Sequence, residues 1–478
     1  MEGNLGSSSA EKIVNQSLLD YYRIPLELLG GVSQFGDPAA GNDGFFQFGK
    51  GNVCYGRSQS GVAADVTGSS AFDASLGIRR EGAVIQLPFD FAETVENLRQ
   101  EQYRQRSSRR LERIASAEPV RKFYYFIRQC LPFRVRRRLQ RIYFQDWKQV
   151  PFPAWPVDST VDRLHEELLR LAMEASGVRK LPFIWFWPEG APNCLVMTHD
   201  VETSLGRDST FDLMDLDDSF GFKASYQIVP EKRYKVSNEY VARIRARGCE
   251  FNIHDLTHDG HLYSERNEFV RRAQEINSYA RQYQSGGFRA GAMYRRQAWY
   301  DAFDFSYDMS VPNVAHLEPV RGGCCTVLPY FIGRILEIPL TTVQDYSLFH
   351  ILKEYSIDLW KQQMALIKER NGLMSFLTHP DYLIDDRARK IYELLLSHLR
   401  EIVTRDNIWL ALPGEVDRWW RARSQMKLLQ KGTDWVIEGA GKERARLAYA
   451  VLDGKRLVYE VGGASVRNCP TGTPYVRA

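Results

Sequence analysis

The sequence predicts an α/β protein built around a distorted (β/α) barrel of about seven or eight strands. Short strand-like runs recur at 195–198, 224–229, 249–253, 286–289, 305–310, 335–340, 373–378 and 407–411. Between most of them the apolar residues follow a helical period, as over 238–247, 265–283, 357–368 and 386–403. This alternation indicates parallel strands joined by crossover helices, and about eight repeats favour a barrel. One stretch, 311–334, breaks the rhythm, and we interpret it as a loop insertion.

At 478 residues the chain exceeds one ordinary domain, and changes in composition divide it into four segments. We predict a disordered start followed by a small N-terminal β module over 1–95, and a basic, aromatic helical linker over 96–180. The barrel is predicted over 181–425, and a small C-terminal β-hairpin module over 426–478.

The two flanking β modules are predicted from local patterns. Residues 1–50 are rich in Gly, Ser, Asn and Asp and show little periodicity, which predicts disorder for about the first dozen. Over 52–91, short β-type runs alternate with Gly/Ser turns. Near the C-terminus, alternating runs at 447–452 and 457–461 flank Asp453-Gly454, a dipeptide typical of a hairpin turn.

Composition excludes several classes of protein. The 44% hydrophobic content suffices for a large core, but no run of 18 apolar residues is present to cross a membrane. The seven cysteines are odd in number and lack CxxC spacing, and no apolar stretch follows a basic start as in a signal peptide. We therefore expect free thiols in a reducing compartment and a cytoplasmic protein.

A basic segment, defined as residues 97–148, carries fifteen Lys/Arg against four Asp/Glu, with aromatic residues interleaved. Three interpretations stay open: an amphipathic stretch on an anionic membrane surface, a nucleic-acid-binding stretch, or a helical linker whose aromatic residues pack on the barrel. We expect weak contact with an anionic membrane surface, which for a cytoplasmic protein is the inner membrane face, and no nucleic acid partner.

The first barrel strand delivers several ionisable residues at its carboxyl end. Residues 194–197 form a short apolar run typical of a buried strand, and the polar residues that follow it are Thr198, His199, Asp200 and Glu202. Parallel α/β enzymes build their sites at such strand ends. The alternative is a strand followed by an acidic helix cap, and this stretch alone does not distinguish the two.

Histidines and charged residues recur at the ends of later strands. His254 and His258 have the spacing i, i+4, which puts two imidazoles on one face of a helical turn, within reach of one metal ion. The alternative is a pair of strand-end histidines hydrogen-bonded in the core. Arg289, Asp308 and His379 end the fourth, fifth and seventh strands, so one pole of the barrel would gather all five side chains.

These residues fall in five ordered motifs: Thr198-His-Asp-Val-Glu202, His254-x-x-x-His258, Arg289-Ala-Gly291, Asp308-Met-Ser310 and Leu377-Thr-His379. In order and spacing they resemble the motifs of the polysaccharide deacetylases of carbohydrate esterase family 4 (the NodB homology domain), over roughly residues 190–425. The resemblance implies a distorted (β/α) barrel and one divalent metal ion, most often Zn²⁺, held by a carboxylate and two histidines.

The resemblance also implies a role for each motif residue. Asp200 would be the general base and His379 the general acid. Arg289 would tether the base, and Asp308 would orient the acid. The implied metal ligands are Glu202, His254 and His258.

Three positions depart from the commonest family pattern. The adjacent acid pair of the first motif is spaced here as Asp200-Val-Glu202. The third motif has Gly291 in place of its proline and Ala292 in place of the following aromatic residue, and the fourth has Val311 in place of its tryptophan. The last two departures remove groups that shape the acetyl pocket in the family.

Independently of the family, these residues suit the hydrolysis of an amide. A metal held by three ligands keeps positions open for water and a carbonyl oxygen, Asp200 can take the water's proton, and His379 can protonate the leaving amine. We therefore expect a metal-dependent hydrolase that removes an N-acetyl group from an N-acetylated sugar or polysaccharide, in bacterial surface polysaccharide metabolism. The alternatives are a related hydrolase of non-sugar C–N amide bonds, and a catalytically silent glycan-binding or scaffold barrel.

Overall fold

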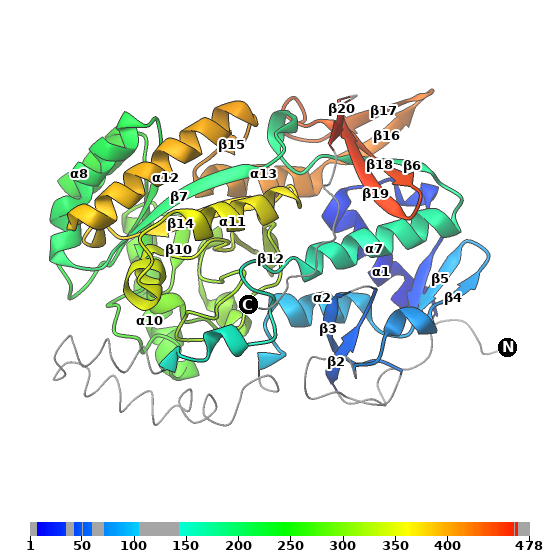
Figure 1. Cartoon of the computed structure of the whole chain (residues 1–478), viewed down its shortest axis with the longest axis horizontal. Coiled ribbons are helices and arrows are strands. Elements are labelled where there is room, and N and C mark those ends of the chain that lie inside the picture. Colours follow the sequence, from blue (N-terminus) through cyan, green and yellow to red (C-terminus); the bar gives the residue numbers. More distant parts are fainter. Residues whose placement is uncertain are drawn as a thin grey trace.

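One curved sheet forms the barrel in the middle of the chain (Figure 1). The computed structural model describes residues 7–34, 43–49, 51–59, 71–104, 143–462 and 464–466. Within these ranges the strand order is β12-β13-β11-β10-β9-β8-β7-β14, with every neighbouring pair parallel except β12 and β13. The strands are β7 (Cys194–Val201), β8 (Ser225–Ile228), β9 (Glu250–His254), β10 (Gly287–Arg289), β11 (Tyr307–Asp308), β12 (Tyr330–Ile332), β13 (Ile335–Glu337), β14 (Leu373–Thr378) and β15 (Trp409–Leu410), which pairs with the start of β7. The eight predicted strands are confirmed, and the predicted insertion contributes only β12.

Helices cover the outer face of this sheet (Figure 1). They are α8 (Ser204–Ser219), α9 (Asn238–Ala246), α10 (Arg266–Gln282), α11 (Asp358–Lys368), α12 (Asp386–Arg405) and α13 (Pro413–Gln425). Thr203, Ser237 and Asp385 cap α8, α9 and α12 by accepting a hydrogen bond from a first-turn N–H. The apolar stripe of α12, which includes Leu395 and Leu399, is buried in the barrel core.

Within the described ranges, no backbone pairing joins β13 to β14, so the barrel has a seam. Two threonines after β13 bridge it. Thr341 Oγ1 donates to the carbonyl oxygen of Leu373 at 2.7 Å and accepts from the N–H of Ser375 at 2.9 Å. Thr342 Oγ1 donates to the carbonyl oxygen of Ser375 at 2.7 Å. The barrel is therefore distorted at this seam, and the carboxyl ends of its parallel strands still share one edge.

A second lobe combines segments from both ends of the described chain. Its main sheet has the order β20 (Ala464–Val466), β19 (Arg456–Val461), β18 (Leu447–Asp453) and β6 (Lys180–Ile184). The helices α7 (Thr160–Ala175) and α1 (Ser7–Tyr22) lie beside these strands (Figure 1). The hydroxyl oxygens of Tyr22 and Tyr459 are 2.8 Å apart, and Arg423 Nη2 donates to the carbonyl oxygen of Tyr21 at 3.0 Å. The predicted C-terminal hairpin, β18 to β19, is therefore one part of a larger unit.

Smaller sheets complete this side of the molecule. One sheet has the order β1 (Val32–Gln34), β5 (Val84–Leu87) and β4 (Arg79–Glu81). Two hairpins are formed by β2 (Gly44–Gln47) with β3 (Val53–Gly56) and by β16 (Lys427–Lys431) with β17 (Asp434–Glu438). This side also contains the helix α2 (Phe91–Arg99). Asp90 caps α2 by accepting from the N–H of Glu93.

Two features of this lobe join residues that are far apart in the sequence. Residues from Ser7 onward form α1, although the composition predicts disorder for the first dozen, and the buried side chains of Leu18 and Tyr22 join its last turns to the core. The predicted division at residue 180 falls at the start of β6, which pairs with the C-terminal strand β18 and not with a barrel strand. Both differences come from contacts between residues far apart in the sequence.

Most of the basic segment, residues 105–142, lies outside the described residues. Its described beginning is anchored on the barrel. Tyr103 donates its hydroxyl proton to the carbonyl oxygen of Gly323 at 2.6 Å, and Arg295 Nε donates to Glu101 Oε2 at 2.7 Å, with both charged side chains buried. Among the helices that the structure describes, none is long and apolar enough to cross a membrane.

Candidate metal centre

The carboxyl end of β7 sends alternate side chains to opposite faces of the sheet. Thr198 and Asp200 both contact the guanidinium of Arg289 inside the barrel. His199 faces the other way and is buried, with Nδ1 2.8 Å from Thr378 Oγ1 and Nε2 2.9 Å from Asp217 Oδ2 on α8. His199 is thus used to fix α8 against the barrel and lies outside the cluster described next.

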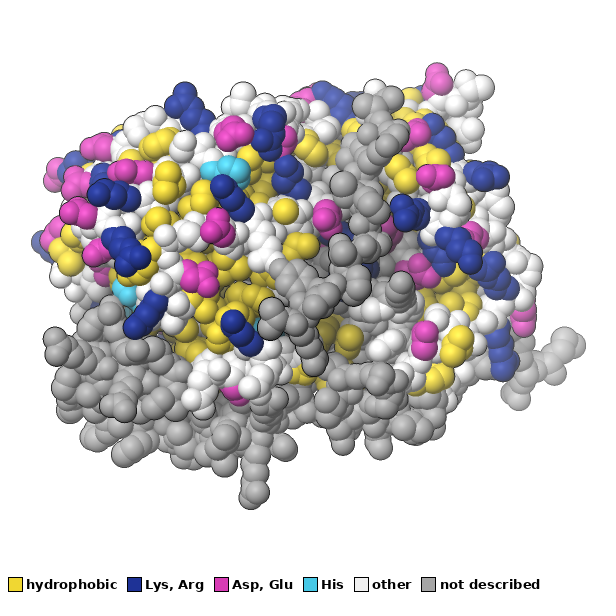
Figure 2. Space-filling model, viewed as in Figure 1, with side chains coloured by type: hydrophobic (Ala, Val, Ile, Leu, Met, Phe, Trp, Pro, Cys, Tyr) yellow, Lys and Arg dark blue, Asp and Glu magenta, His cyan; other side chains and the backbone are white. Residues whose placement is uncertain are grey.

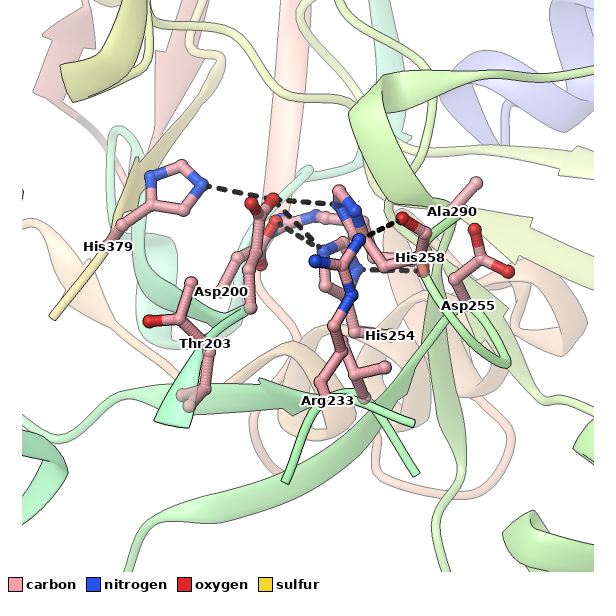
Figure 3. A network of polar contacts seen from close by, with 12 residues as sticks. Asp200, Thr203, Arg233, His254, Asp255, His258, Ala290 and His379 are labelled. Carbon is pink, nitrogen blue, oxygen red and sulfur yellow. Dashed lines mark hydrogen bonds and ion pairs between the residues drawn. The ribbon is translucent and has the colours of Figure 1, made fainter. Parts of the chain in front are cut away.

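Glu202, His254 and His258 bring three ligand atoms together. Figure 3 shows the two histidines side by side, with Asp200 and His379 nearby. Glu202 Oε1 lies 2.8 Å from His258 Nε2 and 3.5 Å from His254 Nε2, and the three atoms lie within 4.8 Å of one another. His254 Nδ1 lies 3.1 Å from the carbonyl oxygen of Arg289. A carbonyl oxygen can only accept, so Nδ1 carries the proton and Nε2 presents its lone pair to the cluster.

This donor set fits a divalent metal ion. The Nε2 atoms of His254 and His258 are buried, and neither makes a hydrogen bond of good geometry within the described residues. Burial would raise the pKa of Glu202, but the imidazoles beside it, His258 foremost, hold that pKa well below its usual value. One carboxylate and two imidazoles are the ligands of catalytic zinc sites, which keep further positions open.

Asp200 is a second carboxylate beside the cluster. Its Oδ1 accepts from Arg289 Nη1 at 2.7 Å, and Arg289, which is fully buried, also donates to Thr198 Oγ1 and to the carbonyl oxygen of Met309. Burial alone would raise the pKa of Asp200, but the guanidinium and the nearby imidazoles lower it below its usual value. Asp200 Oδ2 lies 3.6 Å from His254 Nε2, so one oxygen is tethered and the other faces the cluster.

His379 directly follows β14 and turns its Nε2 toward Glu202. Its Nε2 is 3.6 Å from Glu202 Oε1, and its Nδ1 is 2.7 Å from Asp345 Oδ1. The backbone N–H of His379 also donates to Asp345 Oδ2 at 2.7 Å. Burial would lower the pKa of His379, but the carboxylates of Asp345 and Glu202 raise it well above its usual value. This direction of the pKa suits a proton donor.

Asp308, expected to orient His379, has other hydrogen-bond partners in the structure. Asp308 accepts hydrogen bonds from the N–H and hydroxyl of Ser310 and from the hydroxyl of Tyr300, at 3.0, 2.8 and 2.9 Å. It also stands opposite Glu337 on β13, and burial raises the pKa of both carboxyls. Asp345, which the motifs do not include, takes the place beside His379.

The altered third motif follows from the shape of this site. A Cβ atom placed on Gly291 would lie 2.7 Å from Asp255 Oδ2 and 2.9 Å from His258 Cδ2, closer than real Cβ contacts. A larger residue here would therefore have to displace the Asp255 carboxylate or the His258 ring. Val311, at the altered fourth motif, is fully buried, and its N–H donates to Glu337 Oε1 at 2.9 Å.

Solved structures similar to this chain include three whose functions are named. A Mycobacterium smegmatis protein assigned as a polysaccharide deacetylase is 14% identical, covers 52% of this chain and 98% of its own, and gives a TM-score of 0.42. The peptidoglycan deacetylase PdaC of Bacillus subtilis is 10% identical, with coverages of 47% and 90% and a TM-score of 0.31. A family 4 acetyl xylan esterase of Clostridium thermocellum, solved with a cobalt ion, is 13% identical, with coverages of 48% and 91% and a TM-score of 0.28. No family model and no curated protein sequence matches the chain.

Proposed function

We propose that this protein is a metal-dependent hydrolase that removes an N-acetyl group from an N-acetylated sugar or polysaccharide. One observation carries the proposal: a three-ligand cluster lies beside a carboxylate and an imidazole that are each held by a buried partner. Arg289 donates to Asp200 and lowers the pKa of its carboxyl, and Asp345 contacts His379 and raises the pKa of its imidazole. A site that only binds a ligand has no need of both.

The residues divide the work of amide hydrolysis. Glu202, His254 and His258 would hold a divalent ion, here proposed as Zn²⁺, which when bound supplies a Lewis acid and lowers the pKa of bound water. Asp200 accepts the proton of the attacking water through the oxygen that Arg289 leaves free. His379 donates the proton of Nε2 to the leaving amine, and Asp345 keeps its Nδ1 side oriented and stabilises the charge.

The sugar substrate is proposed from the five ordered motifs, and bacterial surface polysaccharide metabolism by analogy with proteins that share them. Release of acetate from N-acetylglucosamine oligomers, measured with and without added Zn²⁺ and after chelation, tests the activity. We expect release that needs the metal. If the protein hydrolyses simple amides in a metal-dependent way but does not hydrolyse N-acetyl sugars, the proposed substrate class would be wrong and the proposed chemistry would stand. A metal-loaded protein inactive on both would contradict the proposal.

The metal assignment predicts about one divalent ion per chain in protein purified without chelators. Elemental analysis measures it. Replacing both His254 and His258 by Ala removes two of the three proposed ligands, so the metal content should fall to background. His398→Ala, a histidine on α12 in contact with Glu401, is the matched control and should keep the parent content. Full occupancy in the double variant would refute the ligand set.

The basic segment predicts weak, salt-sensitive binding to anionic vesicles. On the face shown in Figure 2, positive and negative side chains are interspersed. The sequence itself puts fifteen Lys/Arg against four Asp/Glu within residues 97–148. Cosedimentation with vesicles of 30% phosphatidylserine at low and high salt measures the binding, with neutral vesicles as the control. Replacing Arg136, Arg137 and Arg138 by Gln should reduce the binding to anionic vesicles several-fold. Equal sedimentation with anionic and neutral vesicles would contradict charge-dependent binding and favour the interpretation of the segment as a packed linker.

A further inference from the structure

The loop between β8 and α9 contacts both segments that carry the proposed metal ligands. Two neighbouring residues of this loop, Arg233 and Tyr234, make these contacts, and we call them the clamp. Arg233 is bound to the segment that carries His258, and Tyr234 is bound to the end of β7, beside Glu202. The clamp therefore joins two ligands that are 56 positions apart in the sequence.

Arg233 binds backbone carbonyl groups at the His258 loop (Figure 3). Its Nε donates to the carbonyl oxygen of Thr257 at 3.1 Å, and its Nη2 donates to the carbonyl oxygen of His258 itself. This loop needs support, because Asp255 and His258 both have a positive φ, at 58° and 51°. L-residues rarely adopt this conformation unless neighbouring contacts impose it.

Tyr234 binds the other segment. Its hydroxyl donates to the carbonyl oxygen of Val201, the last residue of β7, and accepts from the N–H of Val229 at 3.1 Å. Val201 is also the last residue of β7 that pairs with β8, so this bond holds the strand end from which Glu202 departs. The loop is itself anchored, since the N–H of Glu231 donates to the carbonyl oxygen of Leu256 at 3.1 Å.

We propose that Arg233 and Tyr234 are positioning residues of the metal centre, which set the separation of Glu202 Oε1 and His258 Nε2. Neither contacts a ligand atom; both act on the backbone that carries the ligands. The inference rests on the metal centre of the proposed function and is independent of the substrate.

If Arg233 positions His258, its removal should change the metal affinity in the direction opposite to that expected from its charge alone. Arg233 places a positive charge beside a cation site, so its removal, judged by charge alone, would strengthen metal binding. If its hydrogen bonds position His258, removal weakens binding, because residues that orient metal ligands contribute about 10- to 100-fold in affinity. The direction of the change therefore separates the two roles.

The experiment measures Zn²⁺ affinity by competition with a chromophoric chelator, in the parent and in Arg233→Met, Arg233→Lys and Tyr234→Phe. We expect Arg233→Met and Tyr234→Phe to weaken binding about 10- to 100-fold, and Arg233→Lys to restore part of the loss because it keeps one donor. Lys235→Met removes a positive charge from an exposed side chain of the same loop and should bind like the parent. The visible spectrum of the Co²⁺-loaded proteins should change for the clamp variants and not for the control.

Parent-like or tighter binding by folded Arg233→Met would overturn the inference and leave the metal centre in place. If that variant does not fold, Tyr234→Phe, which loses one hydroxyl, decides alone: parent-like affinity overturns the inference and weaker binding supports it. A parent protein that binds no Zn²⁺ or Co²⁺ would overturn the metal centre and the clamp together.

Discussion

Asp200→Asn should keep its metal and lose nearly all turnover, whereas Glu202→Gln should lose metal affinity first. Asp200 has one oxygen committed to Arg289 and the other free, which suits a base. Glu202 has its Oε1 between two imidazole nitrogens, which suits a ligand. Removal of the base is expected to cost about 10²–10⁴-fold in turnover. The amide oxygen of Asn can still accept from Arg289, so the fold should survive the change.

Metal titration of the two variants distinguishes this assignment from its reverse. Excess Zn²⁺ should restore part of the activity of Glu202→Gln, since its defect is occupancy, and none of the activity of Asp200→Asn. The reverse assignment is a real competitor, because Asp200, Glu202 and His379 also present ligand atoms within 4.8 Å of one another. Rescue of the Asp200 variant alone would show that Asp200 is the ligand and Glu202 the base.

His379→Ala should lower turnover on an N-acetyl sugar by about 10²–10⁴-fold with metal content nearly unchanged. The imidazole is the proposed proton donor to the leaving amine and is not among the three proposed ligands. Asp345→Asn should give a smaller loss in the same direction, because it removes the negative charge that keeps His379 protonated. Turnover and metal content are measured on the same samples.

Asp308→Asn is the matched control for Asp345→Asn. Both changes convert a buried aspartate to its amide, but Asp308 lies among Ser310, Tyr300 and Glu337, away from His379. We expect Asp308→Asn to act on stability and to leave the turnover of the folded protein close to that of the parent. A loss of turnover with Asp308→Asn that matches the Asp345 variant would contradict the geometry. A fully active His379→Ala would make that histidine structural.

The barrel was predictable because its signals are local. Each strand is a short apolar run, each crossover helix has its own apolar stripe, and both periods are visible without knowledge of the partners. The gathering of His254, His258 and His379 at one edge then follows from topology, since parallel strands end on the same side. His199 also lies at the end of a strand but does not join the site, because alternate residues of a strand face opposite sides of the sheet.

Asp345 could not be found in the same way. It follows the seam of the barrel, outside any regular strand, and it reaches His379 only because Thr341 and Thr342 hold this segment against β14. Nothing in the residues around Asp345 marks that contact. Asp308 has the expected strand-end position, but its neighbours Ser310 and Tyr300 satisfy its carboxylate. The pairing of carboxyl groups across strands cannot be seen in one strand alone.

The pairing of β6 with β18 has a consequence for how the protein is made. On a ribosome α1 emerges before the residues of the barrel, and the barrel emerges before β18 and β19. The hydroxyl of Tyr22 can form its hydrogen bond only after Tyr459, 437 residues later, has been synthesised. The barrel can therefore complete its sheet during translation, and the second lobe closes last. A nascent chain that stops before Leu447 keeps β6 as an unpaired edge strand, which is the kind of surface that chaperones protect from aggregation.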